Sequence, residues 1–110
     1  MKLPNAENAV VDIKKLRYYC LSNSHPRGKY KARVFYAALG LTEKDTESLQ
    51  AAILEAAYNN DAVATEKDDY GQRYVLDFMM NGPSGSGNIR SSWIVRTGED
   101  FPRLTSCYVL

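Results

Sequence analysis

Hydrophobic residues in the first part of the chain recur with the spacing of an amphipathic helix. Asp12 is a suitable N-cap because its carboxylate can accept hydrogen bonds from the exposed amides of the next turn. Val11 and Leu16 occupy the positions of a hydrophobic staple around that cap. The pattern therefore predicts a first helix over residues 13–21.

Two further helices are expected before residue 60. The second should run from residue 29 or 30 to residue 38, with Gly40 closing it in a left-handed conformation. Thr42 and Asp45 have the spacing of a capping box, which predicts a third helix extending to about Tyr58. Apolar residues of that helix form one stripe: Leu49, Ala52, Ile53 and Ala56.

Beyond residue 60 the apolar period changes from about 3.6 to about 2, which indicates strands. Strands are predicted over residues 74–80, 89–96 and 103–110, and a short one over residues 62–66. The glycines and proline of residues 82–87 predict a loop. Alternate residues of the two central strands can share an apolar face: Tyr74, Leu76, Phe78, Met80, Ile89, Ser91, Trp93 and Val95.

This order of elements predicts an α+β fold for residues 1–110 as a single domain. Two to three N-terminal helices should pack on one face of a C-terminal, three- to four-stranded antiparallel sheet. The other face, which carries arginines, is left free for a ligand.

The composition is that of an ordinary globular protein, with 45% hydrophobic and 25% charged residues. No signal-peptide or membrane-spanning segment is expected, so the predicted location is cytoplasmic. In that compartment Cys20 and Cys107, which are far apart in the sequence, are expected as reduced thiols rather than a disulfide. With one histidine and two scattered cysteines, neither a metal site nor another cofactor is predicted.

Charge is distributed unevenly along the chain. Residues 1–35 hold eight Lys and Arg against two Asp and Glu, residues 36–70 hold two against eight, and residues 71–110 hold four against three. The near-neutral total therefore conceals a basic first third and an acidic middle third.

The most basic stretch surrounds the only histidine, His25. Pro26 disfavours a helical conformation at His25, so the histidine should lie on a loop. Four cations follow it: Arg27, Lys29, Lys31 and Arg33. Cations at a helix N-terminus oppose the helix dipole, which a bound phosphate would relieve. Two interpretations remain open: a phosphate-binding site, and a solvated basic face that could also pair with the acidic segment.

His25 is either a structural histidine or a proton-transfer group whose neutral form is favoured by neighbouring cations. RNA cleavage without a metal needs a base for the 2′-hydroxyl, cations for the charge on phosphorus and an acid for the 5′-oxygen. On the sheet, Arg90 could contact phosphate and Tyr108 could stack on a base, although both residue types are ordinary in these positions. The acidic residues Glu66, Asp68 and Asp69 are expected in a solvated loop or as a shield for the basic patch.

Several motifs resemble a bacterial family of small uncharacterised domains. The main one is the sequence HPxGxxKARVF that starts at His25, and further matches are the pairs Tyr70-Gly71 and Pro102-Arg103 and the triplet Trp93-Ile94-Val95. Members of that family occur as free-standing proteins and as C-terminal modules of toxins, so the resemblance implies a toxin-like domain.

The order of helices and strands is also similar to the barnase, EndoU, colicin D and RelE group of metal-independent ribonucleases. That resemblance implies that His25, Lys31 and Arg33 correspond to basic residues of the helical part. Ser106 and Tyr108 would correspond to the hydroxyl and aromatic positions of the last strand, where relatives usually have threonine in place of Ser106.

Three functions are compatible with these features. The first is a toxin-like ribonuclease with His25, Lys31, Arg33 and Ser106 as catalytic residues. Its RNA would also be bound by Arg27, Lys29, Arg90 and Tyr108, and a small antitoxin-like protein would neutralise it. The second is a non-catalytic module that binds nucleic acid or protein with the same cations. The third, a nucleotide-dependent transferase, is poorly supported because no glycine-rich phosphate loop follows a strand.

Overall fold

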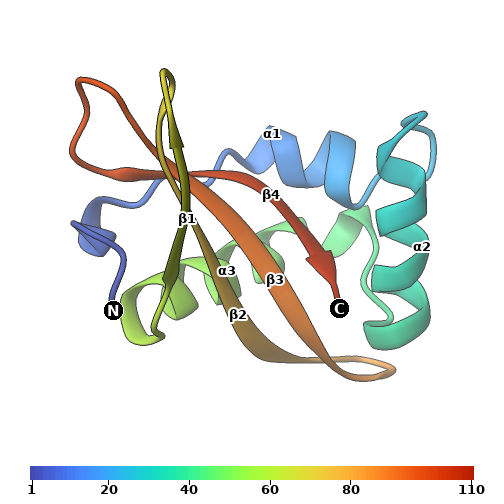
Figure 1. Ribbon diagram of the computed structural model, residues 1–110. Coiled ribbons are helices and arrows are strands. Elements are labelled where there is room, and N and C mark those ends of the chain that lie inside the picture. Colours follow the sequence, from blue (N-terminus) through green and yellow to red (C-terminus); the bar gives the residue numbers. More distant parts are fainter.

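The computed structural model describes all 110 residues and has the predicted α+β fold. Its helical part precedes its strands (Figure 1). In order, the helical elements are η1 (Ala6–Asn8), α1 (Ile13–Lys15), η2 (Leu16–Cys20), α2 (Gly28–Leu39), η3 (Glu43–Asp45) and α3 (Thr46–Asn59). The strands are β1 (Val63–Asp68), β2 (Gly71–Gly82), β3 (Gly85–Arg96) and β4 (Pro102–Val109).

The four strands form one antiparallel sheet in the order β1-β2-β3-β4. The short strand expected over residues 62–66 is present as β1, so the sheet has four strands. In Figure 1 the twisted sheet passes in front of α3, while α2 lies beside the C-terminal end of β4. The helices thus cover one face of the sheet, and β4 is the edge strand nearest α2.

The first helical segment starts as predicted but does not continue as a regular α-helix. The Asp12 carboxylate accepts a hydrogen bond from the backbone N–H of Lys14 at 2.9 Å, which confirms its role as N-cap. In η2 the N–H of Leu21 donates to the carbonyl of Leu16, five residues earlier, at 2.9 Å. This wide, π-helical turn was not predicted, and such turns are frequent at functional sites.

The ends of the other two helices follow the predicted capping residues. Gly40 has φ of 77° at the C-terminus of α2. Thr42 and Asp45 form the capping box, with the Asp45 carboxylate accepting from the N–H of Thr42 at 2.8 Å. These caps fix the ends of α2 and the start of the segment leading into α3.

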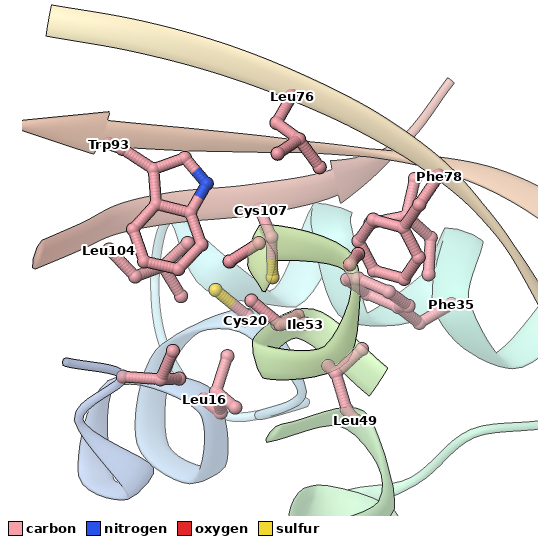
Figure 2. Packing of buried hydrophobic residues seen from close by; sticks show 14 of the residues in the cluster. Leu16, Cys20, Phe35, Leu49, Ile53, Leu76, Phe78, Trp93, Leu104 and Cys107 are labelled. Carbon is pink, nitrogen blue, oxygen red and sulfur yellow. The ribbon is translucent and has the colours of Figure 1, made fainter. Parts of the chain in front are cut away.

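The hydrophobic core lies between the helices and the inner face of the sheet (Figure 2). Trp93 is its largest fully buried side chain. Its indole N–H donates to the Ser91 hydroxyl at 2.8 Å, and that hydroxyl donates to the carbonyl of Leu76 at 2.7 Å. The buried polar atoms at the centre of the sheet therefore have hydrogen-bond partners.

The prediction of a loop over residues 82–87 is wrong, because most of these residues belong to β2 and β3. β2 and β3 pair through Gly82 and Gly85, which leaves only Pro83 and Ser84 as the turn. A Cβ atom on Gly82 would come within 2.2 Å of the Leu39 carbonyl oxygen, so α2 packs directly against this hairpin. The glycines mark a close approach of two backbones rather than an end of strand structure.

β4 contains an irregularity that determines which side chains face the core. Ser92 pairs with Ser106, but the next residue, Trp93, pairs with Leu104, so Thr105 is an extra residue. Leu104 and Cys107 are consequently both buried although they are three residues apart. Ser106 is only partly buried at the edge of the sheet.

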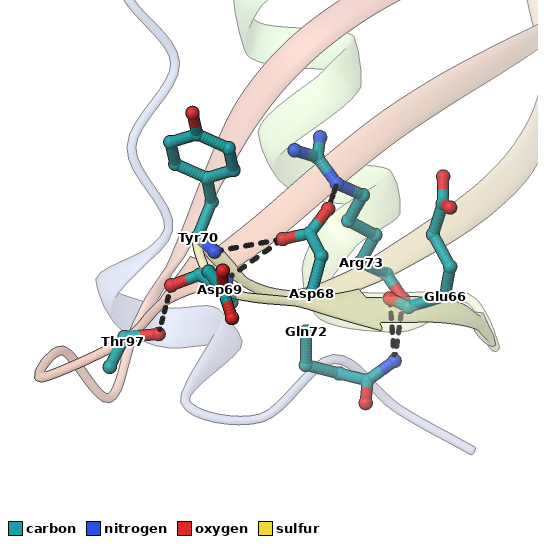
Figure 3. Close-up of polar contacts among 8 residues, drawn as sticks. Glu66, Asp68, Asp69, Tyr70, Gln72, Arg73 and Thr97 are labelled. Carbon is teal, nitrogen blue, oxygen red and sulfur yellow. Dashed lines mark hydrogen bonds and ion pairs between the residues drawn. The ribbon is translucent and has the colours of Figure 1, made fainter.

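Three acidic residues of the middle third, Glu66, Asp68 and Asp69, belong to the β1–β2 hairpin (Figure 3). The Asp68 carboxylate accepts from the backbone N–H of Tyr70 at 2.9 Å and of Gly71 at 3.3 Å, and from Nε of Arg73 at 3.1 Å. These bonds lower the pKa of Asp68, with the Arg73 hydrogen bond contributing most. Asp68 thus organises the turn, and the expectation that Glu66 and Asp68 lie in a loop is wrong because both are in β1.

Candidate functional site

Two residues predicted as catalytic meet at the junction of α2 and β4. Lys31 Nζ donates a hydrogen bond to the Ser106 hydroxyl at 2.6 Å, although the two residues are 75 positions apart in the sequence. Both side chains are partly buried. The Ser106 hydroxyl hydrogen remains available for another acceptor, so the pair presents an ammonium and a hydroxyl together.

Two tyrosine rings flank the ammonium group of Lys31. Its Nζ lies 4.9 Å from the centre of the Tyr19 ring and 5.8 Å from the centre of the Tyr108 ring. Both distances are within the range of cation–π attraction. An anion bound at Lys31 would therefore meet aromatic surface as well as the ammonium group.

His25 lies next to this cluster, in edge-to-face contact with Tyr19 at a ring-centre distance of 4.6 Å. Its Nδ1 accepts hydrogen bonds from the backbone N–H of Arg27 at 3.1 Å and of Gly28 at 3.0 Å. Its carbonyl accepts from the N–H of Lys29 at 3.0 Å. His25 therefore caps α2, since it satisfies amides that the first helical turn leaves free.

The cap determines which nitrogen of His25 carries the proton. Because Nδ1 accepts two hydrogen bonds, the neutral ring must have its hydrogen on Nε2. In this state Nε2 carries a hydrogen that it can donate and has no lone pair in the ring plane. A proton-transfer role at Nε2 would therefore require the ring to release the two amides.

Gly28 explains why the helix can begin so close to η2. A Cβ atom at this position would lie 1.9 Å from the carbonyl oxygen of Tyr19. Only glycine allows this approach, and the approach places Tyr19 beside His25 and Lys31. The HPxGxxK part of the motif thus combines a cap, a helix start, a close contact and the lysine that reaches Ser106.

The remaining cations of the basic stretch do not converge on Lys31 and Ser106. Arg33 follows Lys31 by two residues, which places it about 160° away around the helix. Its guanidinium lies 5.6 Å from the centre of the exposed Tyr30 ring, and Lys29 Nζ lies 5.2 Å from the same ring. Arg27 is exposed on the loop. Of the four residues predicted as catalytic, Lys31 and Ser106 are in contact, His25 lies beside them through Tyr19, and Arg33 points elsewhere.

Arg90, predicted to bind RNA, is engaged with a neighbouring strand. Its Nε and Nη2 donate to the two carboxylate oxygens of Asp77 at 2.8 and 2.9 Å. This pair raises the pKa of Arg90, with a smaller contribution from Tyr108, and lowers the pKa of Asp77. Arg90 pairs with Tyr108 across β3 and β4, so it lies close to the tyrosine that flanks Lys31.

The basic stretch has no acidic partner. The four ion pairs of the chain join the N-terminus to Asp61, Arg73 to Asp68, Arg90 to Asp77, and Arg103 to Glu99. None of these pairs includes a cation between residues 14 and 33. The basic face is therefore not paired with the acidic segment, and its cations are open either to solvent or to a bound anion.

Three surface clefts surround Lys31 and Ser106. One of about 540 Å³ is lined by residues of α1, η2 and β4 together with Lys31, and one of about 350 Å³ lies between α2 and β4 and also includes Lys31. A third, of about 450 Å³, runs over the uncovered face of the sheet and also reaches Ser106. Lys31 and Ser106 therefore lie where several hollows meet.

The two cysteines support this junction from the core. Figure 2 shows the sulfur atoms of Cys20 and Cys107 facing each other, and both residues are fully buried. A hydrogen bond from Cys107 lowers the pKa of Cys20 to about 7, and the hydrogen bond together with burial raises that of Cys107 well above its ordinary value. Cys20 follows Tyr19 and Cys107 follows Ser106, so this contact holds the two site residues near each other.

Sequence reasoning missed several residues around the site, above all those of α1 and η2. Lys14, Lys15, Tyr18 and Tyr19 were not predicted as site residues. The signal was present in their spacing, because residues four apart share a helix face. Lys14 with Tyr18 and Lys15 with Tyr19 have this spacing.

No group of three or more His, Cys, Asp and Glu side chains lies close enough to hold a metal ion. No helix combines the length and the apolar character that crossing a membrane requires. What the site offers chemically is a set of cations, hydroxyl groups and aromatic rings.

The fold and site define a small α+β domain with a basic and aromatic junction between its second helix and its last strand. The chain belongs to the family described as domain of unknown function (DUF6883), whose model matches residues 2–110. This agrees with the resemblance to a family of small uncharacterised domains. Among curated proteins, none matches the sequence.

The chain is similar over nearly its whole length to a solved structure. That structure is a chain of a "contact-dependent growth inhibition toxin - immunity protein complex from Klebsiella pneumoniae 342", with 24% sequence identity and a TM-score of 0.66. The alignment covers 92% of this chain and 99% of the other. At this level of identity the likeness establishes a shared fold.

Proposed function

We propose that the protein is a toxin-like ribonuclease that cleaves RNA without a metal ion and is neutralised by a small protein partner. The observation that carries the proposal is the Lys31–Ser106 pair between the Tyr19 and Tyr108 rings. An ammonium and a hydroxyl at the meeting point of several clefts suit a phosphodiester, whose charge increases during cleavage. The fold shared with a chain of a toxin–immunity complex supports the toxin-like part and the partner.

In the proposed reaction the ribose 2′-oxygen attacks the adjacent phosphorus, so the bond from phosphorus to O2′ forms and the bond to O5′ breaks. The products are a 2′,3′-cyclic phosphate and a 5′-hydroxyl. Lys31 stabilises the negative charge on the phosphoryl oxygens and gives a proton to the departing 5′-oxygen, while the 2′-hydroxyl proton passes to water. Ser106 holds Lys31 and donates a hydrogen bond to a phosphoryl oxygen.

His25 has two possible roles in this scheme. The general acid or base expected from the sequence would need Nδ1 to release the amides of Arg27 and Gly28. With the cap intact, His25 contributes a hydrogen bond from Nε2, and we favour this role. The intact cap also supports the second candidate function, a non-catalytic nucleic-acid-binding module, because it leaves the site without a histidine base.

The decisive experiment measures RNA degradation by the purified protein in excess EDTA. Wild type should degrade RNA, and Lys31→Met should reduce the rate by at least 100-fold. Lys44→Met, which removes a lysine of η3 that lines none of the clefts around Lys31 and Ser106, is the matched control and should retain the wild-type rate. Ser106→Thr should keep more activity than Ser106→Ala because only the first retains a hydroxyl group.

If the RNA stays intact with wild type and with every variant, the cleavage proposal is rejected. RNA binding that Lys31→Met weakens would then support the binding module. Expression in bacteria gives an independent test of the toxin-like part. Wild type should arrest growth and Lys31→Met should not, and co-expression of the partner should restore growth.

A further inference from the structure

Lys31 lies on the boundary between two clefts, and both have tyrosine in their walls. The first cleft is lined on one side by Tyr18 and Tyr19, and the second by Tyr30 and Tyr108. Lys31 is the only residue that lines both. We propose that each cleft binds one nucleobase of a single-stranded polynucleotide whose connecting phosphate lies on Lys31; this rests on the proposed RNA substrate.

The second cleft offers an apolar surface with cations at its margin. Tyr30 is 59% exposed and Val34 is 44% exposed, which leaves a ring and a branched aliphatic side chain open to solvent. Lys29 Nζ lies 5.2 Å from the centre of the Tyr30 ring, and the Arg33 guanidinium carbon lies 5.6 Å from it. An aromatic surface with adjacent cations suits a base that stacks while its phosphates are held beside it. Arg33 then binds a flanking phosphate.

The first cleft has the same combination from different elements. Tyr18 is 60% exposed, and the cleft also includes Lys14 and Lys15. Asp12 is its one acidic residue, and that carboxylate is engaged with the N–H of Lys14 as the N-cap of α1. The cleft is therefore cationic and aromatic, which matches the charge of a nucleic-acid strand.

The pair of clefts favours a single strand over a duplex. Bases in a duplex are stacked on one another, whereas an unpaired strand can turn its bases outward onto aromatic side chains. Two clefts that share Lys31 in their walls suit neighbouring nucleosides whose connecting phosphate lies on that lysine. A protein partner could bind the same aromatic surface without a phosphate at Lys31. The test below distinguishes a nucleic-acid strand from a protein partner.

The test measures binding of a fluorescent six-nucleotide 2′-O-methyl RNA, which lacks the free 2′-hydroxyl needed for cleavage. Tyr18→Ala and Tyr30→Ala should each weaken binding by roughly 5- to 100-fold, the range expected for the loss of one stacked base. The matched control is Tyr36→Ala, because Tyr36 lies on the same helix as Tyr30 with similar exposure, 62%, and lines neither cleft. It should bind like wild type.

Two further comparisons can overturn the proposal. A duplex of the same length should bind more weakly than the single strand, and equal or tighter binding of the duplex would refute the two-cleft arrangement. Wild-type affinity in both Tyr18→Ala and Tyr30→Ala would also refute it and would leave the aromatic surface to a protein partner. Binding is measured here without cleavage. If the protein binds the RNA as expected but degrades none, the proposal of two nucleobase-binding clefts stands and only the proposed ribonuclease activity is refuted.

Discussion

At the scale of single residues, His25 combines features that the sequence could not separate. Its place on a loop before Pro26 was predictable, and so was its basic surrounding. The hydrogen bonds from the amides of Arg27 and Gly28 to Nδ1 were not, because capping is usually expected from Ser, Thr, Asp or Asn. An imidazole nitrogen provides the same acceptor, and the sequence pattern does not reveal which nitrogen it uses.

Replacing His25 by asparagine and by alanine distinguishes the cap from chemistry. His25→Asn keeps an acceptor near the position of Nδ1, so its free energy of unfolding should stay close to wild type. His25→Ala should lose about 1 kcal/mol, as expected for removal of a cap. Urea unfolding of the three proteins measures this difference.

The activity of the same variants tests the role we favour. With His25 as a hydrogen-bond donor, RNA cleavage by His25→Asn should fall by about 10-fold, as expected for the loss of one hydrogen bond. A loss of 100-fold or more with a changed pH–rate profile would instead show proton transfer by the imidazole. That outcome would mean that the ring gives up the cap during the reaction.

Arg33 shows why candidate residues grouped by sequence do not always meet in space. It stands two positions after Lys31, and two residues of an α-helix correspond to a rotation of about 200°, or about 160° measured the shorter way round. Lys31 reaches Ser106 because its side chain is long and lies on the helix face next to β4. The spacing of charges in the sequence does not specify that face. Ser106 itself faces the site because Thr105 is an extra residue in β4, and bulges have no reliable sequence signal.

At the scale of elements, the junction of η2 with α2 depends on one close backbone contact. The carbonyl of Tyr19 occupies the space that a side chain at position 28 would need. The sequence predicted both helices correctly to within a few residues, but it gave no sign that their backbones touch. Tertiary contacts of this kind cannot be predicted from the helix propensities of the local sequence.

Gly28→Ala should therefore separate η2 from α2. Because the added Cβ meets backbone atoms, the helices themselves must move, and we expect a loss of at least 2 kcal/mol in unfolding free energy. Thermal unfolding measures the change, and Lys29→Ala, at the next position of the same helix, should remain within about 0.5 kcal/mol of wild type. A Gly28→Ala protein as stable as Lys29→Ala would contradict the close contact.

Three ion pairs of the sheet and its connections have carboxylates that give the fold a defined pH dependence. Hydrogen bonds from arginines lower the pKa values of Asp68, Asp77 and Glu99, in each case with the arginine as the largest cause. A carboxyl group with a lowered pKa in the folded state stabilises the fold at pH values above its unfolded-state pKa. The ordinary values are 3.8 for Asp and 4.5 for Glu.

The melting temperature should thus be nearly constant from pH 7 to about pH 5 and then fall as these groups are protonated. Asp77→Asn should lower the melting temperature at pH 7 and make the decline at acidic pH shallower, because one of the three groups is absent. Glu55→Gln, at an exposed position without an ion pair, should leave the profile unchanged. Parallel profiles for wild type and Asp77→Asn would show that the Arg90 pair contributes nothing.

At the scale of the whole molecule, the fold was more predictable than the site. Alternation of apolar residues in β2 and β3 identified the buried face, because a half-buried strand must alternate. The glycine-rich hairpin was the main error, since Gly82 and Gly85 are required by the packing of α2 and by strand geometry rather than by a loop. The site, in contrast, depends on residues from η2, α2 and β4 that only the tertiary fold brings together.

The uneven charge of the chain leads to a prediction about the molecule as a whole. The cations on both sides of Lys31 have no carboxylate partners, so a nucleic acid can release counterions on binding there. For a single strand the logarithm of the binding constant should fall with the logarithm of salt concentration by about 0.7 for each phosphate neutralised. The number of contacts is therefore measurable as a slope.

Lys14 and Lys29 stand at different clefts, so replacing both removes one contact from each side of Lys31. The Lys14→Gln/Lys29→Gln protein should bind the six-nucleotide 2′-O-methyl RNA with a salt slope that is smaller than wild type by about 1.4. The Lys44→Gln/Lys67→Gln protein has the same net charge but keeps both clefts intact, and its slope should equal that of wild type. If both double variants changed the slope equally, the attraction would arise from net charge alone, and the strand would have no defined path across Lys31.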